Sequence, residues 1–150
     1  MPQSLALLHT HLVFSTKNRS PLLNDEIRPA LHSYLGKVLI NLKCHPVIIN
    51  SVDDHIHLLF DLARTVSMSQ VVEDLKKSSS KWLKTQHPNL DQFAWQSGYG
   101  AFAVSASQIE KVTQYISNQK EHHLKTSFQD EYRLLLERHN IPYDEKYVWD

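Results

Sequence analysis

The stretch Asp54-His55-Ile56-His57-Leu58-Leu59-Phe60 sets the architecture of this chain, because a β-strand is the one regular structure that accounts for its pattern. Successive side chains of a strand point to opposite faces of a sheet. His55 and His57 therefore share one face, where two imidazoles one strand step apart can chelate a divalent metal. The other face carries an unbroken apolar row that anchors the strand in a core: Ile56, Leu58, Phe60 and Leu62.

Patterns on both sides of this strand predict three more strands and four helices. Strands are predicted over 5–16, 45–52 and 55–62, with a short one at the end of 95–104. Helices are predicted over 24–42, 67–86, 107–123 and 127–139, with Asn24 and the capping-box residues Ser67 and Ser107 as three of their starts. This order predicts an α+β fold, with a ferredoxin-like βαββαβ core, a mostly antiparallel sheet and added C-terminal helices, as a single domain over 1–150.

The apolar spacing also predicts which faces are buried. In the first strand, Leu12 and Phe14 face one way, and His9 and His11 face the other. Because the first strand of a ferredoxin-like sheet pairs with the third, these two histidines are expected beside the His55 pair. There we favour a structural or supporting role, with metal ligation as the alternative. The first helix is expected to bury one stripe: Ile27, Leu31, Tyr34, Val38 and Leu42.

The bulk composition bounds the class of protein. The 150 residues are 41% hydrophobic, which suffices for one compact domain with a core. The 16 Lys and Arg residues balance the 16 Asp and Glu residues, so no strong global charge draws the chain to nucleic acid or to a membrane. Cys44 is the single cysteine, which excludes an intramolecular disulfide. With no apolar run of membrane-spanning length and no signal-peptide pattern in 1–10, we expect a cytoplasmic protein without membrane contact.

The predicted helix 107–123 carries the second group of chemically active side chains. Helix positions three, four and seven apart share a face, and one such face holds Lys111, Tyr115, Asn118, Gln119 and His122. The opposite face would be buried by Ile109, Val112 and Ile116. A tyrosine beside an amide, on a helix that can lie over the histidine strand, indicates nucleophilic catalysis at phosphorus. Because a free tyrosine has a pKa near 10, its hydroxyl needs a metal ion or a base nearby.

These residues and the sequence segments around them resemble the single-tyrosine HUH transposases of small bacterial insertion sequences. The resemblance rests on His55-Ile56-His57 together with Tyr115 and Gln119. It extends to four longer segments, 11–19, 95–102, 115–119 and 128–132, and so covers nearly the whole chain. Motif identity, order and spacing all agree with that family.

The resemblance implies a reaction and a set of site residues. Tyr115 matches the nucleophile, His55 and His57 match two metal ligands, and Gln119 matches the third. The ion in that family is Mg²⁺ or Mn²⁺. The implied reaction cleaves single-stranded DNA with hairpin ends, leaves the 5′ phosphate on the tyrosine, and reseals the strand by attack of another 3′ hydroxyl. A homodimer is also implied, in which the tyrosine helix of one subunit can serve the metal site of the other.

Several basic and aromatic residues remain candidates for contact with DNA. Lys76, Lys77 and Lys81 in the second helix, with Lys17 and Arg19 after the first strand, are expected to contact phosphates. The alternative for the lysine cluster is an ordinary solvated helix face. Trp82 and Trp95 are expected in the core rather than stacked on bases. His122 and His123 cannot both face one point from a helix, so His122 is expected to be solvated, with an approach to DNA or to the metal as the alternative.

Three functions are consistent with the sequence, and we favour the first. It is a metal-dependent transposase that moves an insertion sequence through single-stranded intermediates. The second is a domesticated relative that nicks chromosomal palindromic repeats by the same chemistry. The third is a protein that binds DNA hairpins without cleaving them, which the intact set of Tyr115, His55, His57 and Gln119 disfavours. A plain metal phosphohydrolase is weaker, because it has no use for a tyrosine at that spacing.

Overall fold

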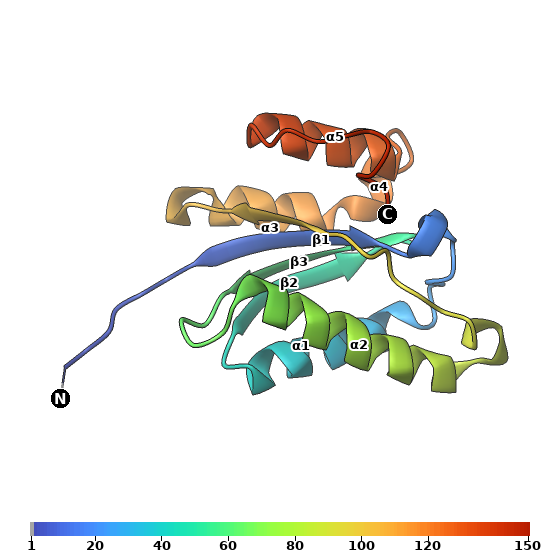
Figure 1. Ribbon diagram of the computed structural model, residues 1–150, viewed down its shortest axis with the longest axis horizontal. Coiled ribbons are helices and arrows are strands. Elements are labelled where there is room, and N and C mark those ends of the chain that lie inside the picture. Colours follow the sequence, from blue (N-terminus) through green and yellow to red (C-terminus); the bar gives the residue numbers. More distant parts are fainter. Residues whose placement is uncertain (1) are drawn as a thin grey trace.

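The computed structural model describes residues 2–150, which form an antiparallel sheet between two layers of helices (Figure 1). The described elements follow in this order: β1 (His9–Ser15), α1 (Arg28–Asn41), β2 (His45–Ser51), β3 (His55–Asp61), α2 (Met68–Gln86), β4 (Gly100–Ala103), α3 (Ile109–Ser117), α4 (Gln119–His122) and α5 (Phe128–Arg138). The strand order is β2-β3-β1-β4, and each neighbouring pair is antiparallel. The predicted α+β class and the ferredoxin-like βαββαβ order are confirmed.

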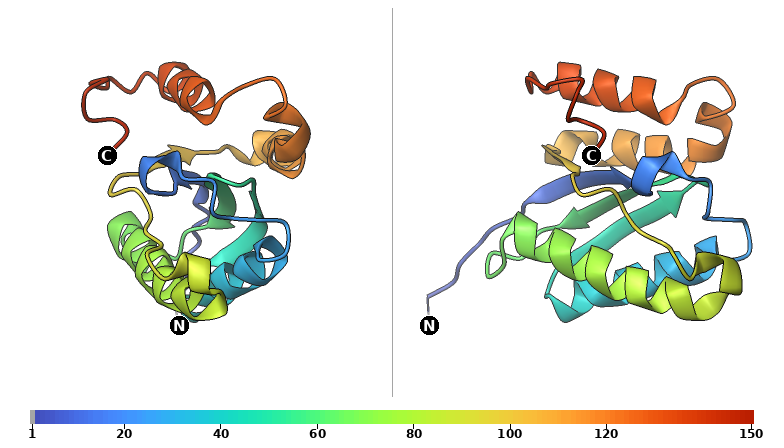
Figure 2. Two further views of the ribbon diagram at one scale, coloured as in Figure 1. Left: turned by 90° about the vertical axis from the view of Figure 1, so that its right-hand side faces the viewer. Right: turned by 45° about the vertical axis from the view of Figure 1, so that its right-hand side comes forward.

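The two faces of the sheet carry different layers. Figures 1 and 2 show α1 and α2 on one face, and α3, α4 and α5 on the other. Leu12, Phe14 and Leu58 point into the larger core with α1 and α2. Val13 faces the opposite way and packs in a smaller cluster with four side chains of α5: Phe128, Tyr132, Leu135 and Leu136. The predicted alternation in β1 and β3 is therefore correct, but both faces are covered.

The first strand is shorter than predicted. It begins at His9, which pairs with Asp61 at the end of β3, and Thr10 pairs with the last residue of β4. Residues 2–8 belong to no strand, although the Leu8 carbonyl still accepts from the Leu62 amide at 2.9 Å, so the predicted start at residue 5 is wrong. Leu5 and Leu7 are 88% and 62% exposed in this N-terminal arm, which extends away from the sheet (Figure 1).

The first helix begins later, and its most deeply buried stripe is shifted from the predicted one: Leu31 is fully buried as predicted, while Ile27, Val38 and Leu42 pack against the core only partly buried. Asn24 closes a turn, in which its Oδ1 accepts hydrogen bonds from two backbone amides, and the helix itself starts at Arg28. The fully buried residues of α1 are Leu31, Leu35 and Leu39. Because α1 packs against both β2 and α2, these three residues are buried on the part of its surface that lies between the two neighbours. Tyr34 is instead half-buried on the α2 side, where its hydroxyl donates to the Ser78 carbonyl at 3.2 Å.

The predicted helix 107–123 is broken in the structure. Ser107 does not cap it: a 3₁₀ turn over Ala106–Gln108 precedes α3, and the N-cap Gln108 makes no side-chain bond. The helix stops at Asn118, with φ −96° and ψ 19°, before the short α4. Asn50 of β2 reaches this break, where its amide donates to the Ile116 and Ser117 carbonyls at 2.7 and 3.3 Å. A contact from a distant strand thus satisfies carbonyls that a continuous helix would have bonded itself.

The remaining helix ends follow their local signals. The Ser67 hydroxyl caps α2 by accepting from the Gln70 amide, and the Ser127 hydroxyl caps α5 in the same way. Asn140 ends the last helix with a positive φ of 55°. Within residues 2–150, every helix is too short or too polar to cross a bilayer.

Candidate metal and tyrosine site

Three histidines on the central strands form the floor of the site. His55 and His57 of β3 are fully buried on the face that α3, α4 and α5 cover. His11 of β1 lies beside them, with its Nε2 2.8 Å from Nδ1 of His57 and the two rings stacked. His9 lies farther along β1 and pairs with Asp61. His11 thus lies beside the pair as expected, whereas His9 does not contact it.

The helix layer brings the other predicted residues to the same place. Gln119, the first residue of α4, is fully buried, with its Oε1 3.4 Å from Nε2 of His55. Its amide nitrogen donates to the Tyr115 carbonyl at 3.3 Å, which directs the oxygen toward the histidines. Tyr115 in the last turns of α3 has its ring edge-on to His57, with ring centroids 5.9 Å apart. The structure therefore collects all four predicted core residues in one cluster.

Two residues of the cluster were not predicted. Glu131 of α5 places Oε1 3.0 Å from Nε2 of His57 and 3.2 Å from Nε2 of His55, while Oε2 accepts a hydrogen bond from the Tyr115 hydroxyl. His123, just after α4, lies 3.1 Å from the same Oε1. The signal for Glu131 was available, because an acid on the inward stripe of an amphipathic helix indicates a buried charge. His123 carried no such signal, since its position depends on the break before α4.

The donor set fits a divalent cation. One ligand atom each from His55, His57, His123 and Glu131 lies within 4.8 Å of all the others. The Nδ1 atom of His55 donates to the Asp54 carboxylate at 2.7 Å, so the Nε2 atom faces the cluster and offers its lone pair when the ring is neutral. Metal-binding histidines are typically oriented in this way, by a carboxylate on the other ring nitrogen. Imidazole, carboxylate and amide oxygen together suit several divalent metals.

The charges in the cluster depend on one another. Burial favours the neutral acid, yet hydrogen bonds from three imidazoles hold the pKa of the Glu131 carboxyl far below its usual range. Burial also opposes protonation of His55, but hydrogen bonds to two carboxylates outweigh it and raise the pKa of His55 to about 9. Burial lowers the pKa of His57 and brings the pKa of His11 to about 3. The buried carboxylate thus needs one positive charge nearby, which a proton on His55 or a cation can supply.

His122 and His123 both approach Glu131, which corrects the prediction that they would diverge. His122 Nε2 lies 3.3 Å from Oε2, without the alignment of a hydrogen bond, and its side chain is 31% exposed. His123 Nδ1 lies 2.6 Å from the Thr126 carbonyl oxygen. The chain leaves the helix at this point, so neighbouring rings are not held 100° apart as they are inside one.

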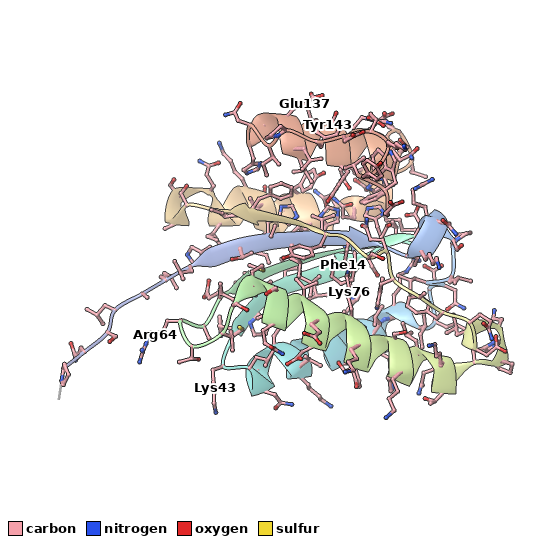
Figure 3. All side chains as sticks on the ribbon, in the orientation of Figure 1. Phe14, Lys43, Arg64, Lys76, Glu137 and Tyr143 are labelled. Carbon is pink, nitrogen blue, oxygen red and sulfur yellow. The ribbon has the colours of Figure 1, made fainter. Side chains whose placement is uncertain are left out.

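The predicted DNA-contacting lysines divide into two groups. The Lys76 ammonium donates to the carbonyls of Gln96 and Gly98, both at 2.7 Å, and Figure 3 shows it directed from α2 toward Phe14. This lysine holds the loop before β4, and burial lowers its pKa to about 8. Lys77 and Lys81 are exposed on the same helix. Lys77 lines a shallow groove together with Lys84, Ser80 and Tyr99.

The other candidates lie elsewhere on the surface or in the core. Lys17 is exposed just after β1, and the Arg19 guanidinium lies 5.8 Å from the centre of the Trp149 ring. The expected core positions of the two tryptophans hold: Trp95 is buried and donates to Ser79 at 3.0 Å. Trp82 is half-buried and stacks on Tyr34, with ring centroids 4.9 Å apart.

An open pocket leads to the tyrosine. Its volume is about 700 Å³, and it lies between β4, α3 and α5. Tyr115 and the buried His11 are among its lining residues, Phe102 contributes an aromatic wall, and Lys111 and Arg138 supply positive charge. A ligand can therefore reach the tyrosine without passing through the core.

Comparison with known proteins identifies the family. The family model for "Transposase IS200 like" matches residues 4–119. The ISDra2 transposase TnpA of Deinococcus radiodurans is 23% identical over 117 residues, which cover 75% of this chain and 84% of that protein. A crystal structure of a candidate transposase from Deinococcus radiodurans R1 aligns with a TM-score of 0.62 at 24% identity, over 79% of this chain and 98% of the other. The structure of the REP-associated tyrosine transposase bound to a REP hairpin aligns with a TM-score of 0.60 at 17% identity, over 82% of this chain and 74% of the other. The chain belongs to the family of IS200-like transposases.

Proposed function

We propose that this transposase cleaves and rejoins single-stranded DNA through a covalent bond between Tyr115 and a 5′ phosphate. The observation that carries the proposal is the position of the Tyr115 hydroxyl. It lies in the histidine and carboxylate cluster, and Tyr115 also lines an open pocket. A nucleophile, a candidate metal centre and a route for substrate thus meet at one atom.

His55, His57 and Gln119 would hold the ion, for which we propose Mg²⁺ or Mn²⁺. When bound, the ion polarises the scissile phosphate and offsets the negative charge that develops in the transition state. The Tyr115 oxygen forms the new bond to phosphorus as the bond to the 3′ oxygen breaks. The phenolic proton, directed at Glu131 Oε2, balances the proton that the leaving 3′ hydroxyl gains. Attack by another 3′ hydroxyl reverses these steps, so the phosphotyrosine conserves the bond energy for strand transfer.

The substrate is proposed to be DNA with a hairpin and an unpaired strand beside it. The unpaired strand would enter the pocket at Tyr115, where Lys111 and Arg138 can bind phosphate. Exposed Lys77 and Lys81, with Lys17 and Arg19, are proposed to contact the backbone elsewhere. The hairpin-bound state of the REP-associated neighbour supports a hairpin as partner.

A homodimer in the cytoplasm is proposed for the working enzyme. The family resemblance supports the dimer, and the cluster described above is formed entirely within one chain. Each subunit would then carry its own complete site. Sedimentation velocity of the purified protein tests the dimer, and a monomer at all concentrations would contradict it.

The experiment that tests the reaction is a denaturing gel of protein, Mn²⁺ and single-stranded oligonucleotides that tile the genomic flanks of its gene. A band of protein joined to DNA is expected, and it should be lost with EDTA and in Tyr115→Phe. Tyr147→Phe is the matched control, because Tyr147 is 59% exposed and outside the cluster. An adduct that persists in Tyr115→Phe would assign the nucleophile to another residue.

A second candidate keeps the chemistry but not the mobility. The REP-associated transposase among the structural neighbours supports a domesticated relative that nicks chromosomal palindromic repeats. Oligonucleotides that carry repeats from elsewhere in the genome distinguish the two. Adducts with those repeats and none with the flanks would favour the domesticated relative, while hairpin binding without any adduct would indicate a binding protein.

A further inference from the structure

The side chains of His123 and Glu131 face each other at the centre of the cluster. The Thr126 carbonyl oxygen can only accept a hydrogen bond, so the Nδ1 atom of His123, 2.6 Å away, carries the hydrogen. In the neutral ring, Nε2 then carries a lone pair. That lone pair faces two oxygens, Oε1 of Glu131 at 3.1 Å and Oε1 of Gln119 at 2.9 Å.

His55 repeats this arrangement on the strand side. Its Nδ1 atom donates a hydrogen bond to the Asp54 carboxylate, and its Nε2 atom faces Glu131 Oε1 at 3.2 Å. If both rings are neutral, two imidazole lone pairs converge on one carboxylate oxygen. Such a buried arrangement is favourable only with a positive charge between the groups, which either a proton on an imidazole or a metal ion supplies.

We propose that Glu131 and His123 are ligands of the metal ion that His55 and His57 bind. The centre would then have three imidazoles and one carboxylate, with Gln119 as an additional oxygen donor. Both added ligands lie beyond residues 4–119, the part of the chain that the family model matches. The inference deepens the proposed function, since it concerns the same metal centre, and it rests on that function for the role of the ion.

The spacing of the atoms supports shared coordination. Bonds from a divalent ion to nitrogen or oxygen are about 2.1 Å long, so neighbouring ligand atoms on one ion lie about 3 to 4 Å apart. Glu131 Oε1 lies 3.0, 3.2 and 3.1 Å from the Nε2 atoms of three histidines. The second oxygen, Oε2, accepts the bond from Tyr115, so one carboxylate links the nucleophile to the metal centre.

This ligand set has consequences for the ion and for the fold. Mg²⁺ prefers oxygen ligands and retains its water, whereas imidazole suits transition metals. Mn²⁺ is therefore expected to bind at least about tenfold more tightly than Mg²⁺. Because Glu131 belongs to α5 and the other ligands to β3 and the segment after α4, the ion would also fasten the last helix to the sheet.

Ion binding by the metal-free protein tests the proposal. The parent, Glu131→Gln and Glu137→Gln are titrated with Mn²⁺ by calorimetry, after circular dichroism has established that each is folded. Glu137 lies on the outer side of the same helix (Figure 3), so its variant removes an equal charge from the same helix. We expect Glu131→Gln to raise the Kd for Mn²⁺ at least about tenfold. Loss of a residue that only hydrogen-bonds to a metal ligand already weakens metal binding by about this factor. A Kd within twofold of the Glu137→Gln value would overturn the proposal.

A second measurement on the parent protein does not depend on a variant that folds. Hydrogen exchange with and without Mn²⁺ should show slower exchange in both β3 and α5 when the ion is bound. Slower exchange in β3 with no change in α5 would overturn the role of Glu131. No DNA enters either experiment, so their outcome is separate from that of the adduct gel. An intact ion site in a protein that never joins DNA would remove the proposed reaction and leave this inference standing.

Discussion

The Tyr115 hydroxyl donates its hydrogen bond to Glu131, which joins the proposed nucleophile on α3 to the one buried carboxylate among residues 2–150. Burial, together with the negative charge of Glu131, raises the pKa of Tyr115 well above its usual range. In the metal-free protein the phenol is therefore held protonated. In the proposed mechanism, positive charge in the cluster would make the tyrosine a better nucleophile, which would link its activation to the ion.

This hydrogen bond should contribute measurably to stability. Tyr115→Phe removes the donor to a buried, charged acceptor, so the free energy of unfolding of the metal-free protein should fall by about 1.5–3 kcal/mol. Urea denaturation measures the change. Tyr147→Phe, at an exposed position, should stay within about 0.5 kcal/mol of the parent. Equal stability of the two variants would show that the contact contributes nothing to folding.

Asn50 should control the end of the helix that carries Tyr115. Asn50→Ala removes the donor to the last carbonyls of α3, so we expect the free energy of unfolding to fall by about 0.5–1.5 kcal/mol. Amide exchange over Ile109–Ser117 should also become faster, because the end of the helix loses its tie to β2. Asn41→Ala, at an exposed position in α1, is the control. Unchanged exchange in α3 would mean that packing alone holds this helix.

The lysines of α2 should separate into a DNA-binding pair and a structural residue. The double variant Lys77→Gln/Lys81→Gln should weaken hairpin binding and lower the slope of log K against log salt by about 1.4–1.8, if each lysine contacts one phosphate. Binding is measured by fluorescence anisotropy across a salt series, with the hairpin that forms an adduct. A slope equal to that of the parent would place the phosphates elsewhere.

Lys76→Met should behave differently. It deprives the carbonyls of the loop before β4 of a charged donor, so the free energy of unfolding should fall by about 1.5–3 kcal/mol. The salt slope of hairpin binding should not change. A variant of parental stability with a lowered slope would reverse this assignment and return Lys76 to the DNA surface.

The parts of the fold that the sequence predicts correctly are those with a local cause. The alternation around His55 requires a strand, and the Ser67 and Ser127 caps lie where their helices start. Gln119 also lies 3.4 Å from His55, as the family resemblance implied, and spacing alone predicted only that it shares a helix face with Tyr115. Local periodicity thus predicts the ferredoxin-like order, whereas the grouping of the site residues came from the resemblance.

The parts that the sequence does not predict depend on contacts between distant segments. At the break before α4, the free carbonyls are bonded by Asn50, which lies 66 and 67 residues away from them in the chain. Once the helix breaks, His123 turns toward the strand, which no helical projection indicates. Glu131 enters the cluster only because α5 folds back over the sheet. The shift of the fully buried stripe of α1 to Leu35 and Leu39 was missed for the same reason, since two neighbours rather than one determine its buried face.

His32 should make the fold sensitive to acid independently of the proposed site. Burial lowers the pKa of His32 to about 4, and the nearby Arg28 charge acts in the same direction, while Nε2 of the ring lies 2.7 Å from the Ser51 hydroxyl. In the unfolded chain its pKa is about 6.5. The unfolded state therefore binds the proton first, so this contribution to stability is complete above pH 6.5 and is lost as the pH falls toward 4. His32→Gln keeps a polar partner for Ser51 and cannot titrate, so its free energy of unfolding should fall less steeply over this range. Parallel curves for parent and variant, from urea denaturation at each pH, would show that His32 is protonated equally in the folded and unfolded states.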